Sequence, residues 1–129
     1  MRYAAPAALA AVLVLASCAM HRGFMPPGAD PHNPRVSVFG SQITVGPDPL
    51  PIPKGDSAAI VWHLHTDGNY TFPDNGITVA SDEFQCRREN DKTFTCQNRH
   101  TKAGHYKYTI RVLDGGKPLE PLDPFIYNE

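Results

Sequence analysis

Short segments in which apolar and polar residues alternate constrain the fold of this chain most strongly. The clearest lies at 106–112, where the apolar or aromatic positions are Tyr106, Tyr108, Ile110 and Val112. Lysine, threonine and arginine occupy the positions between them. Because successive side chains of a strand point to opposite faces, this alternation predicts a half-buried β-strand. No stretch of roughly ten or more residues has a helical period, so we expect an all-β domain.

Other short strands are expected along the chain, with turn residues between them: 36–38, 43–45, 58–65, 70–72, 77–79, 84–86 and 94–96. Within 58–65, the side chains of Ile60, Trp62 and Leu64 share one face. The first half of this segment is apolar on both faces, which indicates a central strand. Prolines at every second position from Pro47 to Pro53 cannot donate hydrogen bonds to a neighbouring strand, so we expect a crossover or an exposed edge there.

The N-terminal residues predict export. Arg2 precedes an apolar run at 4–16 that is too short to span a bilayer as a mature helix, so residues 1–17 read as a secretory signal. The segment 15–18, Leu-Ala-Ser-Cys, resembles the lipobox of bacterial lipoproteins. This resemblance implies cleavage before Cys18, a diacylglycerol on its sulfur and usually a further acyl chain, such as palmitate, on its amino group.

The residues after the lipobox indicate where such a lipoprotein resides. Two or three acyl chains give stable membrane anchoring. Many Gram-negative lipoproteins that stay in the inner membrane carry Asp after the lipidated Cys, whereas Ala19 stands here. The resemblance therefore implies a periplasm-facing protein anchored to the outer membrane. Residues 18–34 are rich in proline and form an extended tether, and residues 35–129 are long enough for one small domain.

The remaining two cysteines predict a disulfide. Once Cys18 is assigned to lipid, Cys86 and Cys96 are an even pair in an oxidising compartment. Both lie on short strands that flank a polar turn, so we expect a hairpin. The residue numbers of opposite positions in an antiparallel hairpin have a constant sum. Pairing Cys86 with Cys96 therefore places Arg88 opposite Phe94.

These elements together argue for a small antiparallel β-sandwich with one disulfide-stapled hairpin. Roughly seven or eight short strands without a helix are typical of that architecture. Trp62 on a central strand near a disulfide resembles the immunoglobulin-like fold. In immunoglobulins the bridge joins opposite sheets, whereas Cys86 and Cys96 are expected to join neighbouring strands. The resemblance concerns architecture and implies no function.

Four histidines form the first candidate site: His63, His65, His100 and His105. Residues two apart on a strand project to the same side, so His63 and His65 suit a shared copper or zinc ion. The alternative is that all four are ordinary strand-face and loop residues.

Segment 94–105 also resembles the copper-binding loop of cupredoxins, which are themselves β-sandwiches. This resemblance implies that Cys96 and His100 are ligands, that His105 takes the place of the axial Met, and that His63 or His65 supplies the early His. A disulfide at Cys96 excludes this ligand set, because a bridged sulfur is no thiolate.

Basic residues form the second candidate site. They outnumber acidic residues between positions 87 and 111, and Arg87, Lys107 and Arg111 alternate with apolar residues. We expect these three to form one exposed basic face for an acidic partner, such as lipid A phosphates or another envelope protein. The alternative is a solvated sheet face whose charges prevent edge-to-edge aggregation.

Overall charge and motifs narrow the function. Of the 12 Lys and Arg only Arg2 lies in the signal, which leaves 11 against 13 Asp and Glu. Without strong basicity, an exported chain is not expected to bind nucleic acid. No catalytic motif or cofactor motif stands out, and Asp56 lies in a turn. We therefore expect a non-enzymatic envelope-interaction module without a cofactor, and as the alternative a periplasmic copper- or zinc-binding lipoprotein.

Overall fold

The computed structural model describes residues 29–129. The predicted signal, the lipobox with Cys18 and the first part of the tether lie outside the described residues. The described part is all-β and folds into strands as follows: β1 Arg35–Phe39, β2 Gln42–Gly46, β3 Leu50–Ile52, β4 Ile60–Leu64, β5 Tyr70–Thr71, β6 Ile77–Val79, β7 Phe84–Asn90, β8 Thr93–Asn98, β9 Gly104–Ile110, β10 Leu113–Asp114, β11 Lys117–Pro118 and β12 Phe125–Asn128.

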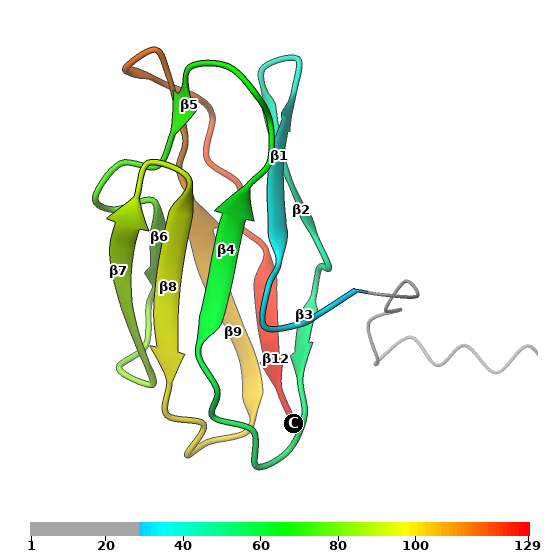
Figure 1. The fold of residues 1–129 in the computed structure, drawn as a ribbon. Helices are drawn as coiled ribbons and strands as arrows, with labels where there is room; N and C mark the ends of the chain where they lie inside the picture. The colour runs from blue at the N-terminus through cyan, green and yellow to red at the C-terminus, as the bar shows by residue number, and fades with distance from the viewer. Residues whose placement is uncertain (1–28) are drawn as a thin grey trace, which may run out of the picture.

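Two sheets pack face to face, as Figure 1 shows. One is five-stranded, with the order β2-β1-β4-β8-β7, and the other is four-stranded, with the order β3-β12-β9-β6. A small three-stranded sheet, β11-β10-β5, lies at one end. The predicted all-β sandwich is therefore confirmed.

The core lies between the two sheets and follows the predicted alternation. On β4, Ile60, Trp62 and Leu64 are buried, and β4 lies between β1 and β8 as a central strand should. On β9, Tyr108 and Ile110 are buried, so the alternation predicted for 106–112 is confirmed there. Burial of such apolar faces is the main driving force for folding.

Two buried polar contacts join the sheets across this core. The Trp62 indole Nε1–H donates to the Tyr108 hydroxyl at 3.3 Å, and the two ring centroids lie 5.3 Å apart. Asn98 of β8 and Asn128 of β12 exchange side-chain amide hydrogen bonds of 2.9 and 3.2 Å. Both contacts satisfy polar groups that would be costly to bury alone, and they also fix how the sheets align.

The β7–β8 hairpin has the predicted register. Cys86 pairs with Cys96, and Arg88 pairs with Phe94. The two cysteines form a disulfide within the five-stranded sheet. The bridge therefore joins neighbouring strands, in contrast to the inter-sheet bridge of immunoglobulins.

Two parallel pairings depart from the predicted antiparallel arrangement. β1 runs parallel to β4, and β3 runs parallel to β12. Parallel neighbours need a long crossover, and each of these pairs is separated by chain that passes through the other sheet. The change of sheet occurs between β2 and β3, at Pro47 and Pro49, where missing N–H groups end the first strand. β3 is an edge strand, so the expectation of an exposed edge is confirmed.

The strand order is similar to that of constant-type immunoglobulin domains. Two sets of three neighbouring strands have counterparts in that fold: β4, β8 and β7 share one sheet, and β6, β9 and β12 share the other. β5 and β6 flank a turn closed by a hydrogen bond from Gly76 N to Pro73 O at 2.9 Å, yet they pair with different partners. A Cβ on Gly76 would lie 3.0 Å from the Phe72 side chain and from the Pro73 carbonyl oxygen, so a larger residue there requires these neighbours to shift.

Candidate functional site

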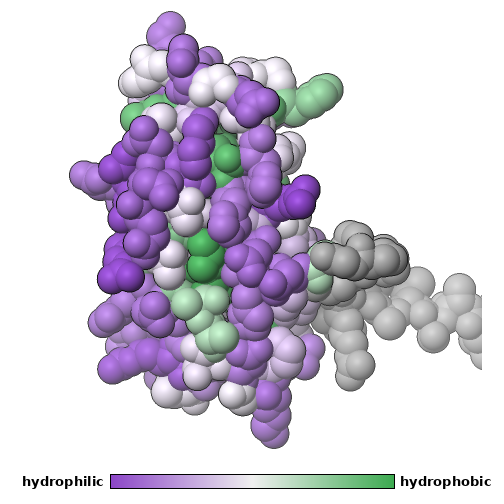
Figure 2. Space-filling view, in the orientation of Figure 1, coloured by the Kyte–Doolittle hydropathy of each residue, from purple (hydrophilic) through white to green (hydrophobic). Residues whose placement is uncertain are grey.

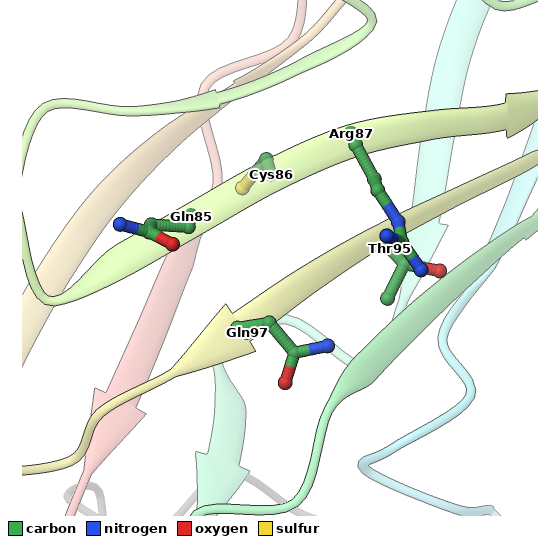
Figure 3. Close-up of a pocket in the computed structure, with 5 residues that line it drawn as sticks. All are labelled: Gln85, Cys86, Arg87, Thr95 and Gln97. Carbon is green, nitrogen blue, oxygen red and sulfur yellow. The ribbon is translucent and has the colours of Figure 1, made fainter.

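The outward side of the β7–β8 hairpin holds a shallow polar pocket. Gln85 pairs with Gln97, and Arg87 pairs with Thr95, so these four side chains form a square on two neighbouring strands. They surround a volume of about 240 Å³ whose lining also includes Cys86 (Figure 3). We call Gln85, Arg87, Thr95 and Gln97 the polar pocket. Two amides, a hydroxyl and a guanidinium offer both donors and acceptors to a ligand.

An ion pair orients the charged member of the polar pocket. Arg87 Nε lies 2.8 Å from Glu89 Oε1 on the same strand. The hydrogen bond from Arg87 holds the pKa of Glu89 below its usual value, so this carboxylate is ionised at neutral pH. Exposed ion pairs contribute little to stability, so the contact mainly restricts where the guanidinium points.

The face around the polar pocket is mostly hydrophilic. Figure 2, drawn in the same orientation as Figure 1, shows polar side chains over most of the five-stranded sheet and a narrow apolar strip between them. Val61 of β4 is half-buried, points outward and lies opposite Thr95. The polar pocket therefore borders an apolar surface, as many ligand sites do.

Two of the four candidate histidines lie on this same face. His63, on β4, and His65, one residue beyond the end of β4, both point outward, as predicted, and their ring centroids are 6.1 Å apart. His63 Nε2 is 3.0 Å from the side-chain oxygen of Asn33. His65 is exposed. We call His63 and His65 the histidine pair.

The other two histidines lie elsewhere. His100 is in the loop after β8, at the opposite end of the sandwich from the end of β4 (Figure 1), and its Nε2 is 2.7 Å from the backbone oxygen of Glu129. His105 is on β9 in the four-stranded sheet and stacks on Tyr127, with ring centroids 4.5 Å apart. Within residues 29–129 no group of three or more His, Cys, Asp or Glu side chains is arranged to hold a metal ion.

The cupredoxin-like ligand set is not formed. Cys96 is fully buried and bridged to Cys86, so it has no thiolate to offer copper. The His100 ring contacts the backbone oxygens of Asp56 and Glu129, whereas the His105 ring stacks on Tyr127. The resemblance of segment 94–105 to a cupredoxin loop is therefore wrong as a guide to a site.

The three residues of the expected basic face do not lie together. Arg87 is on the outer side of the five-stranded sheet, whereas Lys107 is on β9 of the four-stranded sheet, 3.8 Å from Asp123. Arg111 follows β9 and donates to Thr78 Oγ1 at 2.9 Å. The outer sides of two stacked sheets face opposite directions, so the prediction of one continuous basic face is wrong.

A larger groove lies at the end of the sandwich that carries β10 and β11. Its volume is about 470 Å³, and its lining combines prolines and leucines with one base and one acid: Pro73, Arg111, Pro118, Leu119, Glu120 and Pro121 among them. This groove has no signal in the sequence, because its walls come from segments that are far apart in the chain.

The amides of the polar pocket were also missed, although a signal for them existed. The register that pairs Cys86 with Cys96 also pairs Gln85 with Gln97 and places both outward.

No protein-family model matches this sequence, and a search of curated proteins finds no significant relative. Among the residues described, there is no helix with the length and apolar character needed to cross a membrane.

Proposed function

We propose that this protein is a lipoprotein anchored through Cys18 to the outer membrane, and that its periplasm-facing sandwich is a non-enzymatic binding module. The anchor rests on the lipobox resemblance of segment 15–18. The module binds a component of the envelope, either a protein or an acidic glycolipid, through the outer side of the five-stranded sheet.

The observation that carries the binding proposal is the polar pocket. Its side chains come from two adjacent, disulfide-joined strands, so their relative positions are fixed before a ligand arrives. Amides, a hydroxyl and a guanidinium can bind carbonyl, hydroxyl or phosphate groups. The four groups include no carboxylate and no imidazole, which are the usual general acids and bases, and this favours binding over acid–base catalysis.

Fractionation of cells tests the anchor. The parent protein is expected with the outer membrane, and Cys18→Ser is expected to lose both the lipid-dependent processing and the outer-membrane location. A Cys18→Ser protein that still partitions with detergent-phase membranes and is still processed would refute lipid anchoring.

Photo-crosslinking in intact cells tests the binding face. A photoreactive residue at Gln97 is expected to give a discrete adduct, whereas the same residue at Thr109, on the other sheet, gives none. Arg87→Gln should weaken the Gln97 adduct, and Lys107→Gln, the matched loss of an exposed cation on the other sheet, should leave it unchanged. Equal adducts from both positions, or no adduct at Gln97, would count against this face.

A further inference from the structure

The histidine pair is held on a fixed backbone. β4 is flanked on both sides, by β1 and by β8. His63 N donates to Pro34 O at 3.0 Å, and His65 N donates to Val36 O at 2.8 Å. Binding a ligand between the two rings therefore restricts side-chain rotation but does not require the backbone to become ordered. Backbone ordering is the larger of these two entropic costs.

The separation of the rings matches one shared metal ion. Metal–nitrogen bonds of about 2.0–2.1 Å place imidazole centroids about 4.5 Å apart for a right-angle geometry and about 6.4 Å apart for a linear one. The centroids of His63 and His65 are 6.1 Å apart, inside that range. A tetrahedral or square arrangement needs the rings closer than 6.1 Å, so metal binding requires rotation about their side-chain bonds.

A hydrogen-bonded chain orients one of the two rings. The amide oxygen of Asn33 accepts from His63 Nε2 at 3.0 Å, and the amide nitrogen of Asn33 donates to Asp30 Oδ2 at 2.7 Å. An amide oxygen can only accept, so His63 carries its proton on Nε2 and leaves the Nδ1 lone pair free. Metal-binding histidines almost always donate their other ring N–H in this way.

We propose that His63 and His65 form a binding site for a divalent transition-metal ion, with Asn33 and Asp30 as positioning residues. Two imidazoles select Cu²⁺ over Ni²⁺ and Zn²⁺ by the usual affinity order of these ions. Water completes the coordination, because no third protein ligand is arranged there among the described residues. Such a site exchanges its metal ion readily. The metal-site proposal does not depend on the proposed binding of an envelope component.

One nearby charge limits the affinity. Arg35 of β1 is the direct neighbour of His63 in the sheet and is exposed on the same face. A guanidinium at that distance repels a divalent cation, although exposure to water weakens the effect. Removing this charge should tighten metal binding, which a purely adventitious histidine contact elsewhere on the chain would not show.

The test is a Cu²⁺ titration of the purified, metal-stripped protein, followed by calorimetry and electron paramagnetic resonance. Cys18→Ser is used as the background, so that a free thiol outside the described residues does not bind copper. One Cu²⁺ coordinated by two nitrogens is expected. His63→Gln or His65→Gln should lower the affinity more than the roughly 10–100-fold expected of Asn33→Ala. His105→Gln, an exposed histidine on the other sheet, is the matched control and should change nothing.

Other results would overturn the proposal. Cu²⁺ binding that is unchanged in the double variant His63→Gln/His65→Gln, or a loss of affinity in His105→Gln as large as that in His63→Gln, would refute the site. Arg35→Gln should raise the affinity, and an unchanged affinity would contradict the location of the ion beside His63. Thermal unfolding of each variant verifies folding, since the substituted side chains at positions 33, 35, 63, 65 and 105 lie outside the core.

Discussion

The hydrogen bond between Trp62 and Tyr108 allows the sharpest test of what holds the sheets together. Tyr108→Phe removes one oxygen atom and leaves the ring in place. Trp62 and Tyr108 are 0 % and 1 % exposed, so water has no access to the abandoned indole N–H. A buried donor without a partner costs about 1–3 kcal/mol. A loss of about 2 kcal/mol lowers the melting temperature by roughly 8–10 °C in a domain of about 100 residues.

The assay is urea unfolding followed by fluorescence, because the chain has 1 Trp and this residue lies at the contact. Tyr106→Phe is the matched control: the same substitution on the same strand removes a hydroxyl that donates to Lys102 O at the surface. We expect that control to change stability by less than about 0.5 kcal/mol. If both variants unfold at the same urea concentration, the buried hydrogen bond contributes nothing and the reasoning fails.

Two further predictions concern the hairpin and one buried carboxylate. Cys86→Ala combined with Cys96→Ala opens a loop with a sequence separation of 10 and should cost about 2–3 kcal/mol while the fold is retained, as measured by calorimetry. Glu83 is buried, and hydrogen bonds from Thr101 lower its pKa below the usual 4.5. The stabilising effect of Glu83 is therefore complete above pH 4.5 and is lost as the pH falls toward the folded pKa. Glu83→Gln should remove that part of the acid sensitivity, measured by denaturation at pH 3–6. An unchanged pH profile would contradict this prediction.

Sequence periodicity predicted the local features of the fold well. The faces of β4, its central place and the register of the β7–β8 hairpin follow from side-chain alternation and one disulfide, which are local properties. The parallel pairings of β1 and β3 did not follow, because they join segments far apart in the chain. The reciprocal amide contact of Asn98 and Asn128 escaped prediction for the same reason.

The candidate sites show the same division between local and distant information. Alternation correctly placed His63 and His65 on one face, since both belong to one extended segment, β4 and the residue that follows it. It also showed that Arg87 and Lys107 point away from the core. It does not tell which sheet each strand joins, and those two charges lie on opposite sides of the sandwich.

The junction between residues 29–34 and the sandwich has a mechanical consequence. Backbone oxygens of His32, Pro34 and Val36 accept hydrogen bonds from every second residue of β4, beginning at Val61. A pull on the N-terminal side of this segment, along its own direction, loads these bonds in shear. Several bonds then share the tension and must break together, whereas a pull perpendicular to the strand would open them one at a time. A load applied through the N-terminal end of this segment is therefore resisted by hydrogen bonds at the centre of a sheet rather than at a frayed edge.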